Sequence, residues 1–193
     1  IDDRYVFRKE LGSGCEGTAS IYTDQTTGEE VVVKTFFGTG RNAVPDAVGE
    51  VFAWRQSMWP AEIPALLLLS GFGGKNWTAK VHESGSHGSG YVPILDYFLV
   101  TRNERNESVA PQWHLVMPLV QRGTLQSLAG RVRAENPQPP HELDLSLRPT
   151  LRRLLRTLAD LHARGYCHDD VKLDNVFALS RTHWLLGDLG NVR

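Results

Sequence analysis

The stretch "CHDDVKLDN", residues 167–175, contains three aspartates, a lysine and an asparagine. Carboxylate and amide oxygens are hard ligands that suit Mg²⁺, and a carboxylate can also accept a proton from a substrate hydroxyl. A lysine ammonium is a compact cation that binds phosphate. A further acid, Asp188, follows in "GDLG". So many acids around one basic side chain in so short a stretch mark it as a candidate reactive site.

A second candidate segment is "LGSGCEGTA", residues 11–19, in which Gly12, Gly14 and Gly17 form a G-x-G-x-x-G pattern. The pattern alone is weak, and a dinucleotide-binding fold would need a helix after it. Here a strand is expected instead, so the glycines suit a flap between antiparallel strands whose N–H groups approach phosphate oxygens. Lys34, at the end of "VVVK", would lie beneath this flap and bind an anion.

The carboxylate that we expect to pair with Lys34 is Glu50. It lies four residues before Trp54 in an amphipathic segment, and the two side chains would share the inward face of one helix. Glu62 lies beyond Pro60, which is expected to close that helix. The sequence therefore favours Glu50 over Glu62.

The elements that position these residues follow from periodicity and turn signals. Alternating apolar residues predict strands over residues 5–11, 19–23, 30–36, 92–101 and 113–119. Helical spacing predicts helices between Pro45 and Pro60 and over residues 125–133 and 147–164. Residues 70–90 are expected to form a surface insertion, and residues 136–144 a proline-rich loop. The first three strands suggest an antiparallel meander, and the whole pattern predicts an α+β protein of two lobes.

The last of these helices has the clearest amphipathic pattern in the chain. One face carries a row of leucines and the opposite face carries arginines. The leucines are Leu151, Leu154, Leu155, Leu158 and Leu161.

Composition limits the partners. The chain has 193 residues, 41% of them hydrophobic, and a formal net charge of −1, so it has no general attraction to nucleic acid or anionic membrane. No apolar run is long enough to cross a bilayer. The two cysteines, Cys15 and Cys167, cannot form a disulfide framework. We expect a cytoplasmic or nuclear protein without nucleic-acid or membrane partners.

Taken together, "LGSGCEG", "VVVK", "HDDVKLDN" and "GDLG" resemble the signature set of the protein-kinase superfamily, of Ser/Thr type. The order agrees with that family, and so do the spacings: Lys34 follows Gly17 by 17 residues, and Asp188 follows Asp170 by 18. The resemblance covers essentially the whole chain. It implies a kinase-like bilobal fold, with residues 1–120 as an antiparallel-sheet lobe containing one main helix. Residues 121–193 would be the hinge and a partial, mostly helical lobe.

The resemblance also implies roles in phosphoryl transfer from ATP. Asp170 would orient the acceptor hydroxyl and receive its proton, and Lys172 would meet the charge on the transferred phosphoryl group. Asn175 and Asp188 would bind Mg²⁺. Lys34, with Glu50, would hold the nucleotide phosphates beneath the glycine flap.

The same resemblance implies an adenine site. Met117 would be the gatekeeper, while the Pro118 carbonyl and the Val120 N–H would bind the adenine edge; proline keeps its carbonyl, so Pro118 suits this role. An apolar slot would enclose the ring. It would be formed by Leu11, Ala19, Val32 and Phe177. Each of these apolar residues is also compatible with ordinary core packing.

Three departures from the family pattern affect the expected activity. Asp169 replaces the arginine that pairs with a phosphorylated activation loop, so such control is not expected. Glu16 places a carboxylate at the flap tip, where it would oppose phosphates. The sequence stops three residues after Gly190. We therefore expect the activation segment and peptide-binding helices to be missing, in either a part of a longer protein or a reduced kinase, and transfer to exogenous proteins to be weak.

Three functions therefore stay open. The first is ATP- and Mg²⁺-dependent phosphoryl transfer to Ser/Thr hydroxyls of proteins, or the nucleotide-binding part of such a kinase. The second is a kinase-fold regulator that binds ATP or a protein partner without transfer. The third is a small-molecule kinase, which Lys172 disfavours because such kinases usually lack that lysine.

Overall fold

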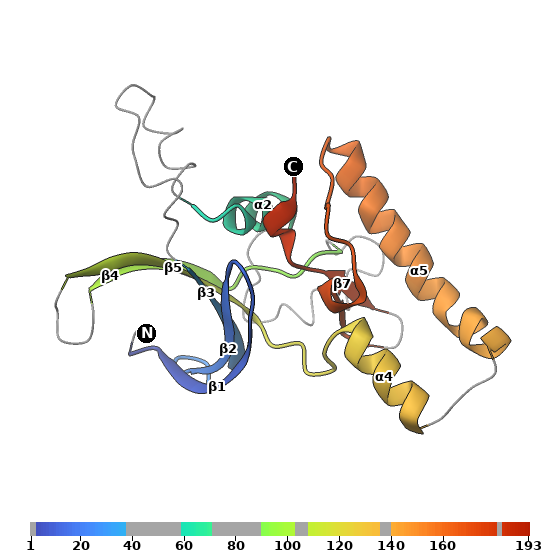
Figure 1. Cartoon of the computed structure of the whole chain (residues 1–193), viewed down its shortest axis with the longest axis horizontal. Coiled ribbons are helices and arrows are strands. Elements are labelled where there is room, and N and C mark those ends of the chain that lie inside the picture. Colours follow the sequence, from blue (N-terminus) through green and yellow to red (C-terminus); the bar gives the residue numbers. More distant parts are fainter. Residues whose placement is uncertain (1–2, 38–58, 71–89, 103–107, 136–139, 181–182) are drawn as a thin grey trace.

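Figure 1 shows the computed structural model of the chain, which describes residues 3–37, 59–70, 90–102, 108–135, 140–180 and 183–193. The described part is a mixed α+β structure with a five-stranded antiparallel sheet and three α-helices. The predicted α+β class is confirmed. Among the described helices, none combines the length and apolar character needed to cross a bilayer.

The sheet has the strand order β1-β2-β3-β5-β4, and all neighbours are antiparallel. Its strands are β1 (Tyr5–Ser13), β2 (Gly17–Asp24), β3 (Glu30–Phe36), β4 (Asp96–Arg102) and β5 (Ser108–Pro118). Strands β1, β2 and β3 form the predicted meander. Gly28 closes the β2–β3 turn at a φ of 74°, which glycine adopts without a steric penalty.

Strand β3 divides its side chains between two environments, because successive side chains point to opposite faces of a sheet. Val31 and Val33 are buried in a cluster with Tyr5, Tyr22 and Val116 on one face. Val32 and Lys34 therefore project from the other face, toward the rest of the molecule.

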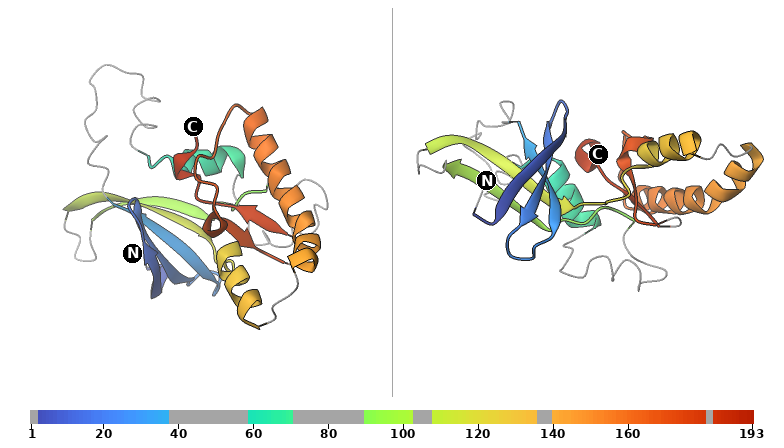
Figure 2. Two further views of the ribbon diagram at one scale, coloured as in Figure 1. Left: turned by 45° about the vertical axis from the view of Figure 1, so that its right-hand side comes forward. Right: turned by 90° about the horizontal axis from the view of Figure 1, so that it is seen from below.

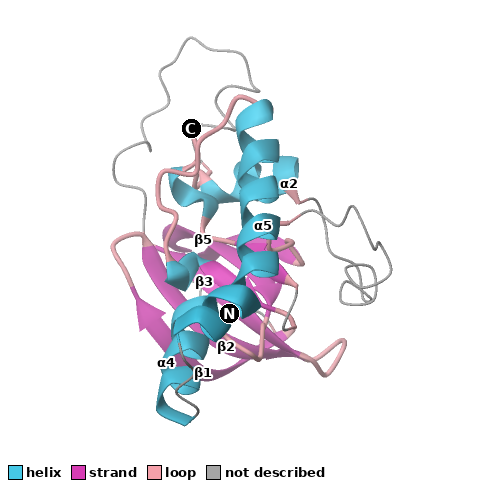
Figure 3. Ribbon diagram, turned by 90° about the vertical axis from the view of Figure 1, so that its right-hand side faces the viewer, coloured by secondary structure: helices cyan, strands magenta, loops and turns pink. Residues whose placement is uncertain are grey.

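That second face packs against helix α2 (Glu62–Leu69) and against the segments that follow β5. Helices α4 (Leu125–Glu135) and α5 (Pro140–Ala163) lie beyond it, and Figure 3 shows them in front of the sheet. The larger core cluster joins all these parts. Its fully buried members include Ile63, Leu66, Leu115, Leu161 and Leu186.

Between the sheet and the two long helices lies a two-stranded ribbon, β6 (Val176–Ala178) and β7 (Trp184–Leu186), as the two views in Figure 2 show. Val176 pairs with Leu186, so the residues just before β6 and just after β7 meet at one end of the ribbon. Short 3₁₀ helices flank it there, η1 (Leu173–Asn175) and η2 (Leu189–Asn191). This end of the ribbon brings Asn175 beside Asp188.

Some predicted boundaries were wrong. Helix α5 begins at Pro140, inside the expected proline-rich loop, because proline is tolerated in the first turn of a helix. Its leucine face is only partly buried: Leu161 has no exposed surface, whereas Leu151 and Leu155 are 48% and 65% exposed. Helix α2 was not predicted, because its apolar run has no polar face to reveal a helical period.

Two other expectations fall mainly outside the described residues. The helix predicted between Pro45 and Pro60 lies largely within residues 38–58, and the predicted surface insertion lies largely within residues 71–89.

Candidate functional site

A cavity of about 1010 Å³ opens between the β1–β2 turn, the face of the sheet that carries Val32 and Lys34, and the β6–β7 ribbon. It brings together every site residue predicted from the sequence except Glu50, which lies outside the described residues. The lining includes Leu11, Gly12, Gly14, Gly17, Ala19, Val32, Lys34, Met117, Pro118, Val120, Asp170, Lys172, Asn175, Phe177 and Asp188. Leu11 and Asp188, which are 177 positions apart in sequence, therefore share one site.

The glycine turn lies tightly over β3. The Gly14 N–H donates to the Gly17 carbonyl at 2.9 Å, and the Phe37 N–H donates to the Glu16 carbonyl at 2.9 Å. A Cβ on Gly17 would lie 2.2 Å from the Thr35 carbonyl oxygen, which is far inside van der Waals contact. Glycine is therefore required at this position for the turn to close over the strand.

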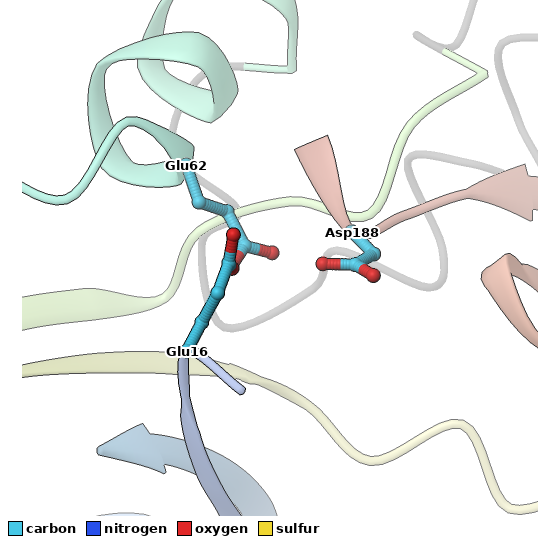
Figure 4. Close-up of side chains that lie close together, drawn as sticks. All are labelled: Glu16, Glu62 and Asp188. Atoms are coloured by element: carbon cyan, nitrogen blue, oxygen red, sulfur yellow. The ribbon is translucent and has the colours of Figure 1, made fainter. Parts of the chain in front are cut away.

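Lys34 lies beneath this turn and has three carboxylate partners. Its Nζ lies 2.5 Å from Glu62 Oε2 and 3.3 Å from both Glu16 Oε2 and Asp188 Oδ1. Figure 4 shows these carboxylates converging from the β1–β2 turn, from α2 and from the segment after β7. Burial by itself would lower the pKa of Lys34, but Glu62, Asp188 and Glu16 outweigh it and raise that pKa. Lys34 is therefore a firmly protonated cation at neutral pH.

The buried partner of Lys34 is Glu62, which corrects the prediction of Glu50. Pro60 does not separate Glu62 from a helix; it precedes a new one, and Glu62 is the first residue of α2. Its side chain is only 2% exposed. Burial raises the pKa of Glu62, and the Lys34 ammonium opposes that effect. Because buried charges need a counter-charge, the pair ties α2 to β3.

Asp188 is positioned by tight backbone packing around Gly187. The Gly187 N–H donates to the Asn175 carbonyl at 2.9 Å, and its carbonyl lies 3.1 Å from His168 Nε2. A Cβ on Gly187 would lie 2.7 Å from the Phe177 ring. Asp188 itself has a φ of 58°, in the left-handed region that aspartate tolerates better than most residues. The result is a carboxylate aimed at Lys34 from the opposite wall.

Asp170, Lys172 and Asn175 form a second polar group. Asp170 Oδ2 accepts hydrogen bonds from Lys172 Nζ at 2.7 Å and from Asn175 Nδ2 at 3.0 Å. Hydrogen bonding from Lys172, supported by Asn175, lowers the pKa of Asp170. The hydrogen bond to Asp170 in turn raises the pKa of Lys172. At neutral pH the group therefore presents a carboxylate beside an ammonium.

Asn175 and Asp188 fit the predicted role of magnesium ligands. The Asn175 amide nitrogen also donates to the Asp170 carbonyl at 2.9 Å, so the amide is oriented with its nitrogen toward Asp170 and its oxygen is the atom suited to a cation. Asp188, whose neighbour Gly187 is hydrogen-bonded to Asn175, supplies a carboxylate oxygen. Carboxylate and amide oxygens are the hard donors that Mg²⁺ prefers. The Glu16, Glu62 and Asp188 oxygens also lie within 4.8 Å of one another, but the cation among these three is Lys34.

The other end of the cavity is apolar. Ala19 pairs across the sheet with Lys34, and Val32 pairs with Met117, so their side chains share the cavity-facing surface. Phe177 also lines the cavity, from the ribbon. The segment after β5 turns into α4 through Gly123, whose N–H donates to the Val120 carbonyl at 2.8 Å. Apolar side chains from the sheet and from Phe177 therefore line this part of the cavity.

Sequence reasoning missed several residues of the lining. Gln121, Thr124 and Ser127 line the cavity at the start of α4. The Thr124 hydroxyl accepts a hydrogen bond from the Ser127 N–H at 3.3 Å. This is an N-capping contact, which a threonine just before a helical pattern predicts. That signal locates a helix start but does not by itself indicate a binding site.

Asp169 has a structural partner. Its carboxylate forms an ion pair with the Arg193 guanidinium. The backbones of Cys167 and Arg193 are also joined by two hydrogen bonds of 2.8 and 3.1 Å. The chain after η2 is therefore attached to the loop that carries Asp170. Asp174, the other acid left out of the predicted site, is exposed and does not line the cavity.

No protein-family model matches the chain, and no curated protein matches it at a significant level of similarity.

Proposed function

We propose that the protein is an ATP- and Mg²⁺-dependent phosphotransferase of the protein-kinase type that acts on Ser/Thr hydroxyls of proteins. The proposal includes a kinase-like arrangement of two lobes, residues 1–120 and 121–193. One observation carries it: a single cavity holds an apolar slot at one end and, at the other, Lys34, Asp188 and the Asp170 group beneath a glycine turn.

In this proposal each part of the cavity binds one part of ATP. The apolar slot takes the adenine ring, whose edge lies along residues 117–120. The Lys34 ammonium binds the phosphates beneath the glycine turn, because it is a cation on the cavity lining. Asn175 and Asp188 hold Mg²⁺, which neutralises phosphate charge when bound. The protein thus positions the terminal phosphoryl group near Asp170.

Asp170 and Lys172 act on the acceptor. The acceptor oxygen forms a bond to the γ-phosphorus, the bond from that phosphorus to the bridging oxygen breaks, and ADP leaves. Asp170 orients the hydroxyl and takes its proton, for which its lowered pKa keeps it ionised. Lys172, 2.7 Å from Asp170, meets negative charge on the transferred group.

A second candidate function is a regulator that binds nucleotide or a protein partner without transfer. The observation that favours it is the saturation of Lys34 by three carboxylates, because a site that holds its lysine in this way binds phosphate less readily. A small-molecule kinase is a third alternative. The presence of Lys172 disfavours it, because small-molecule kinases of related fold usually lack that lysine.

The decisive experiment measures binding and transfer separately. Calorimetry with Mg-ATP at millimolar concentration should give a saturable signal that chelation of Mg²⁺ weakens. Labelled ATP should then be offered to a generic protein substrate and, in parallel, to a panel of small alcohols. The absence of Mg-ATP binding would refute the proposal. Binding without transfer would support the regulator, and transfer confined to small alcohols would support the small-molecule kinase.

A matched pair of variants tests the role of Asp170. Asp170→Asn should lower the transfer rate by about 10²–10⁴-fold while nucleotide affinity stays within a few-fold, because the carboxylate acts on the acceptor. Asp174→Asn is the control, since it removes the same charge from an exposed position outside the cavity. Equal rates for Asp170→Asn and Asp174→Asn would contradict the assignment.

A further inference from the structure

The donors of Lys34 are fully used without any nucleotide. An ammonium has three N–H bonds, and three carboxylates lie within hydrogen-bond distance of its Nζ. A phosphate oxygen that binds Lys34 must therefore take the place of at least one of them. The identity of the displaced group decides how readily the site accepts a polyphosphate.

Glu16 is the partner that is easiest to displace. Its carboxylate is 40% exposed and lies 3.3 Å from Nζ, whereas Glu62 is 2% exposed and lies at 2.5 Å. Asp188 is 33% exposed, but it is needed at the site as the proposed metal ligand. Glu16 alone of the three reaches Lys34 from the glycine turn, on the side where the phosphates would enter.

Only the side chain of Glu16 has to move. Its main chain is held to β3 by the hydrogen bond from the Phe37 N–H, so the turn stays in place while the carboxylate rotates. In the observed position the Glu16 carboxylate lies against Gly190. A Cβ on Gly190 would lie 2.7 Å from Glu16 Oε2 and 3.2 Å from Glu16 Oε1. The absence of a side chain at Gly190 is what gives the carboxylate room.

We propose that Glu16 is a tethered competitor of the nucleotide phosphates, which holds Lys34 until a polyphosphate displaces it. The inference rests on the proposed function and specifies how that same site is regulated. Glu16 would weaken the binding of ATP, whose phosphates take its place, and would leave the binding of adenosine unchanged. Glu16 would also set a minimum charge for ligands, because only a ligand with enough negative charge to displace a carboxylate can bind Lys34.

The test compares Mg-ATP and adenosine affinities by calorimetry for the unmodified chain and Glu16→Gln. If the open arrangement is a minor state of about 10%, removing the competitor should tighten Mg-ATP binding by about tenfold. Adenosine affinity should stay within twofold. Glu10→Gln is the matched control, since it removes one carboxylate from an exposed position on β1 that does not line the cavity.

A second variant changes the contact without changing the charge. Gly190→Ala puts a methyl group 2.7 Å from Glu16 Oε2 and pushes the carboxylate away. It should tighten Mg-ATP binding in the same direction as Glu16→Gln, by a smaller factor. Gly130→Ala, on an open face of α4, is its control and should leave the affinity unchanged.

The outcomes separate this inference from the function on which it rests. If the unmodified chain binds Mg-ATP and Glu16→Gln binds it no more tightly, the competitor role is refuted and the proposed function stands. An equal gain for adenosine would also refute it, because the effect would then not concern phosphates. If neither protein binds Mg-ATP, the proposed function and this inference fall together.

Discussion

Replacing Lys34 by methionine should destabilise the fold, as well as weaken phosphate binding. The substitution leaves three carboxylates whose oxygens lie within 4.8 Å of one another, and one of them, Glu62, is 2% exposed. Breaking a buried ion pair by removing one partner typically costs about 3–5 kcal/mol. We expect about 3 kcal/mol here, at the lower end, because Glu16 is 40% exposed and can turn toward solvent.

The reciprocal change should be milder. Glu62→Gln keeps a hydrogen-bond acceptor for Lys34, which also retains Asp188 and Glu16, so we expect a loss of about 1 kcal/mol. The double variant removes both buried charges and should be more stable than Lys34→Met alone. The coupling energy of the cycle should therefore be about 2–3 kcal/mol.

The cycle is measured by urea unfolding of all four proteins at pH 7, with the slopes compared to confirm a shared denatured state. The same measurement at pH 5 tests the direction in which the stability of Lys34→Met changes with pH. Burial raises the pKa of Glu62, and removing Lys34 removes the effect that opposes this. In Lys34→Met the folded state therefore takes up a proton before the unfolded state does, and part of the lost stability should return as the pH falls. Additivity of the two single variants within about 0.5 kcal/mol would refute the reasoning.

Two further predictions concern stability. Burial lowers the pKa of His114 to about 4, so between the unfolded value near 6.5 and pH 4 the unfolded state binds more protons and stability falls with falling pH. The loss of stability should be roughly 2 kcal/mol after allowance for solvent screening. Thermal melts of His114→Gln should therefore show a flatter dependence of stability on pH over that window. An equally steep dependence in this variant would contradict the prediction. Gly17→Ala should cost at least ~2 kcal/mol because its Cβ would meet the Thr35 carbonyl at 2.2 Å, whereas Gly130→Ala in α4 should stabilise the chain by roughly 0.5–1 kcal/mol. Comparable urea midpoints for these two glycine variants would contradict the steric argument.

Much of the sheet and of the cavity lining was predictable from local pattern. Successive side chains of a strand point to opposite faces, so the run "VVVK" places Val32 and Lys34 on the same face. The pairing of β3 with β2 and β5 then brings Ala19 and Met117 beside them. The polar residues Asp170, Lys172 and Asn175 are close in sequence, so one loop delivers them. Local periodicity and short spacing are both visible in a single sequence.

The parts that could not be predicted depend on how distant segments pack. Helix α2 lies in an apolar run that has no polar face, and only its burial against the sheet and the ribbon defines it as a helix. Leu151 and Leu155 follow the same pattern as Leu161, yet only Leu161 meets the core. A helical period says which residues share a face but not how much of that face another element covers.

The choice between Glu50 and Glu62 shows the same limit at the site itself. Proline was interpreted as the end of a helix, although it is as compatible with the approach to a new one, and local sequence does not distinguish these uses. What distinguishes them is the lysine. Lys34 is fixed by the register of β3, and Glu62 opens the helix that packs against the same core as β7 and η2. A buried carboxylate at that position would be destabilising without a cation, so the Lys34–Glu62 contact is a condition for α2 to dock where it does. The partner of a buried charge is therefore decided by which element can dock beside it, and sequence distance carries little of that information.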